Sequence, residues 1–194
     1  MSFIRHHFQV RPIQAADNVS KLSLGKESYT PLKTFLRKAA LNFHQYNIAK
    51  TYVLIDEPMP NRVLGYITLM NSEIILNKEQ RPQEIYASEK YESFPAVKIG
   101  RLAIDKSLQG YGYGKDFLKW VINFIRDNVA IHVGCRFLVV DSKQESIEFY
   151  KKAGFQFFGL LKEHPSMYLD LFHIHDREEQ RVVSTTGDII REAI

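Results

Sequence analysis

The sequence predicts an α/β (α+β) protein in which helices pack on the faces of one mixed β-sheet. Apolar stretches with strand-like and helix-like spacing follow one another in the order helix, hairpin, strand, helix, strand, helix and two strands. The 194 residues, of which 45% are hydrophobic and 25% charged, fit a single globular domain of ordinary composition.

The bulk properties favour a cytoplasmic protein with an anionic partner. The formal net charge is +4 and the pI is about 9.0. No apolar run approaches the ~20 residues of a membrane span, and residues 1–7 lack the apolar core of a signal peptide. The single cysteine, Cys135, cannot form an internal disulfide, and its apolar neighbours indicate a packed side chain.

The first helix is predicted to begin at Thr30, a good N-cap, with Pro31 at the first helical position. The apolar residues that follow share one helical face: Leu32, Phe35, Leu36, Ala39 and Phe43. Three basic residues lie off that face, where they either form a solvated surface or bind an acidic substrate: Lys33, Arg37 and Lys38.

A hairpin and a central strand are predicted next. Residues 51–55 and 63–70 are rich in β-branched and aromatic residues and are separated by a turn with two prolines. Residues 77–95 are polar and irregular, and a connection of that length is often functional. The strand over 98–104 then leads into a glycine-rich turn.

The second half of the chain closes the sheet. A helix that starts at Gly114 has an apolar inner face made by Phe117, Leu118, Val121, Ile122 and Ile125. A buried strand over 137–141 enters a short helix through a capping box at 142–145, and Gly154 ends that helix. Two strands, over 155–161 and 167–172, follow.

The turn Gln109–Lys115 is the most informative motif. It lies between a strand and a helix, so its backbone N–H groups and the positive end of the helix dipole form an anion site. A Walker loop would need glycine at 109 and a hydroxyl residue after Lys115, and a dinucleotide motif needs another spacing than Gly110, Gly112 and Gly114. Both nucleotide interpretations fail, which leaves another phosphate ligand or a purely structural turn.

Gln109-x-x-Gly112-x-Gly114, preceded by the segment 100–105, is similar to the motif of the GNAT N-acetyltransferase superfamily. A further likeness, over about residues 17–172, is to the GNAT toxins of toxin–antitoxin pairs, which resemble this chain at 48–53, 63–69 and 148–155. The resemblance implies the GNAT fold, acetyl-coenzyme A as donor and the α-amino group of an aminoacyl-tRNA as acceptor.

The same resemblance implies partners and a domain boundary. We expect charged tRNA and a ribbon-helix-helix antitoxin as partners, a homodimer, and no membrane contact. The GNAT domain is predicted over 1–172, and residues 173–194 form an extension that covers a surface, mediates a dimer or binds a partner.

The resemblance also implies roles for individual residues. The turn would hold the pyrophosphate, and the pantetheine arm would lie in a splay between the strands 98–104 and 137–141. The implied coenzyme-binding set is Leu102, Ala103, Ile104, Gln109, Gly110, Tyr111, Gly112, Tyr113, Gly114, Lys115 and Asp141. Tyr150 is the candidate general acid because a phenol is neutral at pH 7, although a tyrosine packed beside Phe149 is the alternative.

The central strand carries no carboxylate before Asp105, which favours an acceptor amine that needs no strong base. A lysine amine titrates near about 10.4, whereas an α-amino group titrates near about 7.7 to 8.0 and is substantially neutral at pH 7. Glu73, Glu84 or Asp105 could still act as a base through water. The basic residues expected to guide an acidic acceptor are Lys33, Arg37, Lys38, Lys98 and Arg101.

No metal site is expected, because His173-x-His175 has no third ligand nearby. Three functions remain open from the sequence. The chain is a toxin that acetylates charged tRNA, an acetyltransferase for a metabolite, antibiotic or protein N-terminus, or a non-catalytic acyl-coenzyme A-binding module. The pyrophosphate turn and Tyr150 together disfavour the third.

Overall fold

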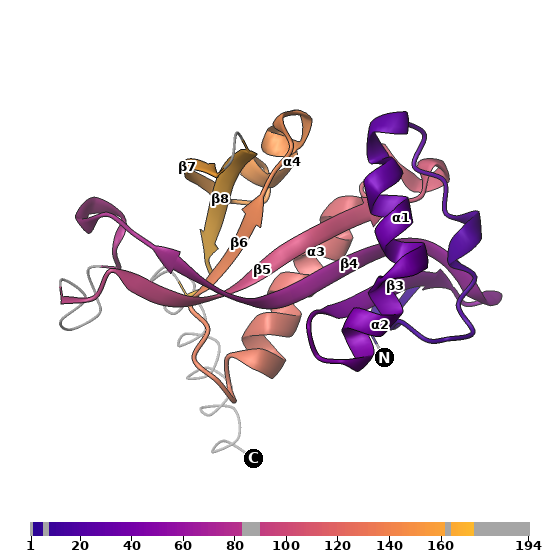
Figure 1. The fold of residues 1–194 in the computed structure, drawn as a ribbon, viewed down its shortest axis with the longest axis horizontal. Helices are drawn as coiled ribbons and strands as arrows, with labels where there is room; N and C mark the ends of the chain where they lie inside the picture. Colours follow the sequence, from indigo (N-terminus) through magenta and orange to yellow (C-terminus); the bar gives the residue numbers. More distant parts are fainter. Residues whose placement is uncertain (1, 6–7, 83–89, 162–163, 173–194) are drawn as a thin grey trace, which may run out of the picture.

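The computed structural model describes residues 2–5, 8–82, 90–161 and 164–172 (Figure 1). Eight strands of this part of the chain form one sheet in the order β1-β2-β3-β4-β5-β6-β8-β7. Their bounds are β1 Ser2–Arg5, β2 Phe8–Pro12, β3 Lys50–Asp56, β4 Met59–Ile75, β5 Ser93–Ile104, β6 Phe137–Asp141, β7 Gln156–Leu161 and β8 His164–Asp170. Only β5 and β6 pair in parallel, and all other neighbours are antiparallel, so the predicted mixed sheet is confirmed.

Helices cover both faces of this sheet (Figure 1). They are α1 Thr30–Lys38, α2 Ala40–Gln45, α3 Tyr113–Phe124 and α4 Ile147–Lys151. Because side chains alternate along a strand, Tyr66 of β4 packs in the core beneath α1 and α2, whereas Ile67 packs in the core beneath α3. Cys135 lies in the α3 core with 7% of its surface exposed, which confirms that it is a packed residue.

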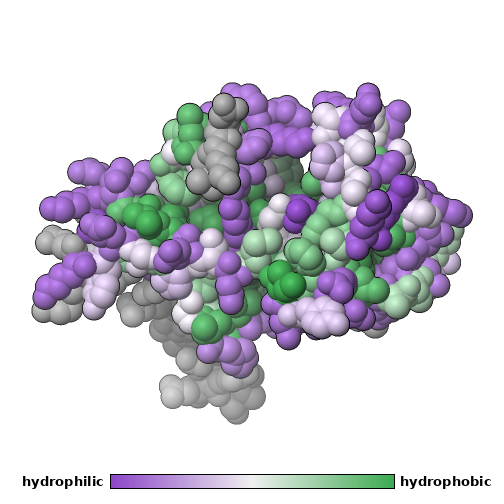
Figure 2. Space-filling model, viewed as in Figure 1, coloured by the Kyte–Doolittle hydropathy of each residue, from purple (hydrophilic) through white to green (hydrophobic). Residues whose placement is uncertain are grey.

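The face that carries α1 and α2 is not wholly covered by helices. Figure 2 shows polar residues over most of this face and apolar residues gathered over its middle, beside α1 and α2.

Within the described ranges, no helix is both long and apolar enough to cross a membrane.

The first predicted helix is divided in the structure. Thr30 is already helical, Tyr29 occupies the N-cap position, and the helix ends at Lys38. Ala39 leaves the helical region with a φ of −130°, and α2 begins at Ala40, which is completely buried. The prediction of one continuous helix and of a threonine N-cap was therefore wrong, whereas the predicted apolar face is confirmed because the same residues pack in one core.

The predicted capping box at Ser142 was also wrong. The Ser142 hydroxyl donates to the carbonyl oxygen of Lys143, and α4 begins only at Ile147 after a 3₁₀ turn over Gln144–Ser146. The backbone N–H of Ser142 donates to Pro165 O at 2.7 Å and continues the pairing of β6 with β8. The backbone N–H of Ser142, which a capping box would bond to the side chain of Glu145, is thus used in strand pairing instead.

Two strands were missed from the sequence, β1 and β2. In β2, Arg11 occupies a buried position, which hides the apolar alternation that reveals a half-buried strand. The central strands also run further than predicted: β4 continues to Ile75 and β5 begins at Ser93. Residues 173–194 lie outside the described residues, so the boundary at residue 172 stays a prediction.

Candidate active site

The glycine turn has the backbone conformation that the motif predicts. Gly110 has a φ of +83° and Gly112, the N-cap of α3, has a φ of +86°. Residues with a Cβ rarely adopt such positive φ values, so both positions favour glycine. At Gly114 a Cβ would meet the ring of Phe149 at 3.4 Å, an ordinary van der Waals contact, so packing alone does not require glycine there.

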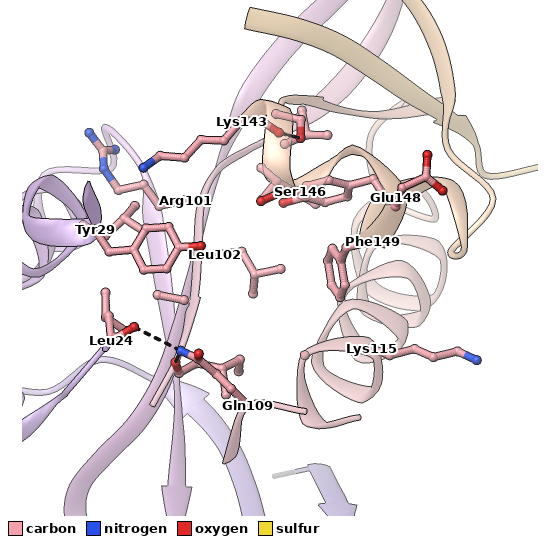
Figure 3. A pocket seen from close by; sticks show the side chains of 18 of the residues that line it. Leu24, Tyr29, Arg101, Leu102, Gln109, Lys115, Lys143, Ser146, Glu148 and Phe149 are labelled. Atoms are coloured by element: carbon pink, nitrogen blue, oxygen red, sulfur yellow. Dashed lines mark hydrogen bonds between the residues drawn. The ribbon is translucent and has the colours of Figure 1, made fainter. Parts of the chain in front are cut away.

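Gln109 ties this turn to its surroundings. Its Nε2 atom donates to Ile104 O at 2.9 Å and to Leu24 O at 3.3 Å (Figure 3). The neighbouring Asp105 is 6% exposed and accepts hydrogen bonds from Ser23 N at 2.8 Å and from Ser107 N at 3.0 Å. The turn is therefore fixed both to the end of β5 and to the N-terminal segment.

Strands β5 and β6 separate beside the turn. They pair from Ala96 with Phe137 to Ile99 with Val140, and the pairing ends there. Gly100 is an extra residue in the pairing of β5 with β4, because Thr68 pairs with Arg101 and Leu69 with Ile99. The bulge marks the point at which the two strands part, and the predicted splay is present in the structure.

A cavity of about 820 Å³ occupies the splay. Its lining includes most of the predicted coenzyme-binding residues: Leu102, Ala103, Ile104, Gln109, Gly110, Gly112, Gly114, Lys115 and Asp141. The side chains of Tyr111 and Tyr113 lie outside this lining; Tyr111 is 70% exposed and Tyr113 packs edge-on against Phe8. The volume is that of a small-molecule site, and the positive-φ glycines leave the backbone open to a phosphate.

Tyr150 lines the same cavity from α4. Its ring packs edge-on against Phe149 and Phe155, with ring centroids 5.0 and 5.3 Å away, and only 6% of the residue is exposed. Burial raises the pKa of the phenol above its ordinary value. The hydroxyl is thus protonated at neutral pH beside the splay, as a general acid must be; its catalytic role stays a prediction.

Replacing Gly112 by Ala tests the turn directly. Alanine is less stable than glycine at a φ of +86° by about 1–2 kcal/mol. The backbone can relieve this strain only by rotating, which turns its N–H groups away from a bound phosphate. We expect acetyl-coenzyme A to bind about tenfold more weakly by titration calorimetry. Gly134→Ala is the control, because Gly134 has an ordinary φ and lies outside the cavity lining; equal affinities for all three proteins would contradict the assignment.

The carboxylates considered as bases have other partners. Burial raises the pKa of Asp105, but hydrogen bonds from Ser23 and Ser107 lower it by more, so the net pKa lies below its ordinary value. Glu73 accepts a hydrogen bond from Ser93 Oγ at 2.6 Å and lies outside the cavity lining, and Glu84 lies outside the described residues.

The carboxylates that do line the cavity are also engaged. Asp141 is paired with Lys98 and accepts a hydrogen bond from Ser166 Oγ at 2.9 Å. Glu148 forms an ion pair with Lys151 at 3.1 Å. Every described carboxylate of the lining is thus paired with a lysine, so this part of the cavity offers no unpaired carboxylate as a base.

Of the predicted acceptor-binding residues, the structure brings only Arg101 into the cavity lining. Its guanidinium carbon lies 3.6 Å from the ring centroid of Phe35. Lys98 is paired with Asp141 instead, and the three basic residues of α1, Lys33, Arg37 and Lys38, lie outside the lining. No cluster of three or more possible metal ligands occurs in the described ranges, and His173 and His175 fall outside them.

Several lining residues were missed by the sequence analysis, among them Leu24, Tyr29, Lys143, Phe149 and Lys152. Phe149 could have been found from its place beside Tyr150. Leu24 and Tyr29 carry no local signal, because they reach the cavity through a long N-terminal loop.

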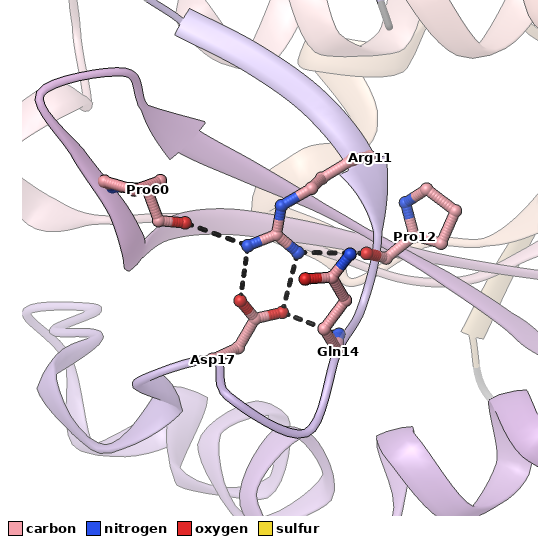
Figure 4. Close-up of polar contacts among 5 residues, drawn as sticks. All are labelled: Arg11, Pro12, Gln14, Asp17 and Pro60. Atoms are coloured by element: carbon pink, nitrogen blue, oxygen red, sulfur yellow. Dashed lines mark hydrogen bonds and ion pairs between the residues drawn. The ribbon is translucent and has the colours of Figure 1, made fainter.

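A buried ion pair anchors that loop (Figure 4). Arg11 of β2 donates from Nη1 and Nη2 to the two carboxylate oxygens of Asp17 at 3.0 and 2.5 Å, and from Nη2 to Pro60 O at 2.8 Å. The side chains of Arg11 and Asp17 are only 9% and 1% exposed. Because Pro60 lies at the start of β4, the pair fixes the start of the loop against that strand.

Comparison with known proteins decides the family. A family model described as an acetyltransferase (GNAT) domain matches residues 47–157. The chain belongs to the GNAT acetyltransferase family. The chain is therefore an acetyl-coenzyme A-dependent N-acetyltransferase, and the predicted GNAT fold is confirmed. The cavity in the splay is the candidate for its active site.

Three solved structures are similar to this acetyltransferase. One, described as AtaTR bound with AcCoA, is 25% identical and has a TM-score of 0.68, with coverage of 86% of this chain and 95% of that one. AtaT complexed with acetyl-methionyl-tRNAfMet is 25% identical, with a TM-score of 0.70 and coverage of 84% and 94%. A mutant of the AtaT toxin is 25% identical, with a TM-score of 0.68 and coverage of 85% and 90%.

Proposed function

We propose that this acetyltransferase transfers the acetyl group of acetyl-coenzyme A to the α-amino group of an aminoacyl-tRNA and acts as the toxin of a toxin–antitoxin pair. The observation that carries the proposal is the likeness over 84% of the chain to AtaT complexed with acetyl-methionyl-tRNAfMet. The described part of the cavity supports it, because its carboxylates are paired and an α-amine needs no strong base.

In this proposal, the glycine turn and strand β5 bind the coenzyme, and Tyr150 transfers a proton. Bound acetyl-coenzyme A supplies the acetyl thioester. The N–H groups of the turn at Gly110, Gly112 and Gly114 bind the pyrophosphate, and the main chain of Leu102–Ile104 orients the pantetheine arm in the splay. As the C–S bond breaks, Tyr150 Oη gives its proton to the leaving thiolate, and the proton that the amine loses on forming the amide bond restores the phenol through solvent.

The neutral α-amine is the nucleophile. An amine with a pKa of about 7.7 to 8.0 is substantially deprotonated near pH 7, whereas a lysine side chain near about 10.4 is almost wholly protonated. We therefore expect the acetylation rate to rise with pH across the titration of the α-amine and to be negligible for lysine side chains.

The toxin proposal implies an antitoxin that binds this chain, and we expect a ribbon-helix-helix protein encoded beside it. The likeness to the mutant AtaT toxin supports the toxin part of the proposal. The homodimer expected from the sequence stays a prediction.

The deciding experiment uses labelled acetyl-coenzyme A and total charged tRNA. Nuclease digestion and mass spectrometry should then show N-acetylated aminoacyl-adenosine from one or a few tRNA species. Deacylated tRNA is the control and should remain unlabelled. Label that appears only on a small-molecule amine or a protein N-terminus would overturn the proposal in favour of the alternative acetyltransferase function.

A further inference from the structure

The cavity has more positive charge than its carboxylates balance. Four lysine and arginine side chains line its described part: Arg101, Lys115, Lys143 and Lys152. The two lining carboxylates, Asp141 and Glu148, are each paired with a lysine that lies outside the lining. The lining therefore carries a net positive charge that attracts anions.

These cations lie at different ends of the cavity. Figure 3 shows Gln109 and Lys115 at the end formed by the glycine turn, whereas Arg101 and Lys143 lie at the opposite end. The pyrophosphate of the coenzyme belongs to the glycine turn. Arg101 and Lys143 are thus left for a second anion, at the end of the cavity away from the glycine turn.

Aromatic rings hold both cations in place without neutralising them. The Arg101 guanidinium carbon lies 3.6 Å from the ring centroid of Phe35, and Lys143 Nζ lies 4.7 Å from that of Tyr29. Lys143 Nζ also donates to Ser28 O at 2.8 Å. Neither cation forms an ion pair with a carboxylate in the described ranges, so both retain their full charge for a ligand.

Lys143 also joins the two walls of the cavity. It follows β6, whereas Ser28 and Tyr29 belong to the N-terminal wall that precedes α1. A single hydrogen bond to a main-chain carbonyl and one ring contact hold a flexible four-carbon stem. To bind an incoming anion, Lys143 has to give up only those two contacts, and it forms a charge-assisted hydrogen bond with the anion in return.

We infer that Arg101 and Lys143 form an anion clamp that binds a phosphodiester at the 3′ end of the acceptor tRNA and so places the α-amine at the thioester. The inference rests on the proposed function. Arginine offers a planar pair of donors that matches two phosphate oxygens, and lysine adds a point charge from the opposite wall. Fixing the acceptor by its backbone orients the amine while leaving the aminoacyl side chain free.

The test compares two acceptors that carry the same aminoacyl ester, charged tRNA and aminoacyl-adenosine, which has no phosphate. We expect Lys143→Gln to raise the KM for charged tRNA about tenfold and to change the KM for aminoacyl-adenosine less than about twofold. The salt dependence of kcat/KM for charged tRNA should become shallower by about 0.7 in its logarithmic slope, because one phosphate contact is lost. Lys143→Arg, which keeps the charge, should restore most of the tRNA affinity.

Two further variants complete the design. Lys50→Gln is the matched control, since Lys50 also donates to a main-chain carbonyl, that of His44, but lies outside the cavity lining. Arg101→Gln, from another element, should reproduce the tRNA-specific loss. The affinity of each variant for acetyl-coenzyme A, measured by calorimetry, verifies that the cavity is intact.

The outcomes separate the clamp from the proposed function. Equal losses for charged tRNA and aminoacyl-adenosine would mean that Lys143 only supports the wall at Ser28, and would overturn the clamp alone. If the wild-type protein acetylates a small amine but no charged tRNA, the proposed function falls and the clamp falls with it.

Discussion

Tyr150→Phe lowers the rate of acetyl transfer at least about tenfold, because a general acid typically contributes about 10²–10⁴-fold. The change removes only the hydroxyl, and the ring keeps its packing against Phe149 and Phe155. Acetyl-coenzyme A affinity and the free energy of unfolding should therefore stay nearly unchanged. Because burial raises the pKa of the phenol, its proton remains available through the alkaline range in which the α-amine is neutral.

The rate is measured as thiol release with charged tRNA as acceptor. Tyr46→Phe is the matched control, since Tyr46 is 72% exposed and lies outside the cavity lining. Turnover of Tyr150→Phe at the wild-type rate would remove this hydroxyl from the mechanism and leave Tyr150 as a core residue.

Asp17→Asn is expected to destabilise the fold by about 3–5 kcal/mol, because it leaves the Arg11 guanidinium buried without a counter-charge. For a domain of this size, that loss lowers the melting temperature by roughly 10 °C. Urea unfolding followed by circular dichroism measures the free energy. The segment that Asp17 anchors leads to Leu24 and Tyr29, so we also expect weaker acetyl-coenzyme A binding.

Lys151→Gln is the contrasting variant. Lys151 and Glu148 form an ion pair whose side chains are 53% and 73% exposed, and such pairs contribute at most about 1 kcal/mol. An Asp17→Asn protein within about 1 kcal/mol of the wild type would show that the buried pair does not hold the N-terminal wall.

The parts of the site that could be predicted from sequence are those whose chemistry is local. Gly110 and Gly112 have positive φ values because a tight turn opens α3, and the spacing of these residues is visible in the chain. Residues 102–104 and Asp141 could be placed because each ends a strand of strong β pattern. Tyr150 followed from a short helix and a family motif rather than from any property of the residue alone.

The parts that could not be predicted depend on contacts between distant segments. Lys143 reaches the carbonyl of Ser28, more than a hundred positions away in the chain, and nothing near Lys143 indicates that contact. Strand β2 was hidden because Arg11 is buried through Asp17, which a local hydrophobic pattern cannot show. The helix cap predicted at Ser142 failed because pairing with β8 uses the same backbone group.

Isothermal titration calorimetry of the purified protein with acetyl-coenzyme A tests the central claim most directly, namely that the glycine turn and the splay together bind the coenzyme. The account predicts saturable uptake of one coenzyme per chain below millimolar ligand, with affinity reduced by Gly112→Ala. Titrations at two temperatures ensure that a heat near zero at one of them does not hide binding. No uptake at either temperature with millimolar ligand would contradict the account.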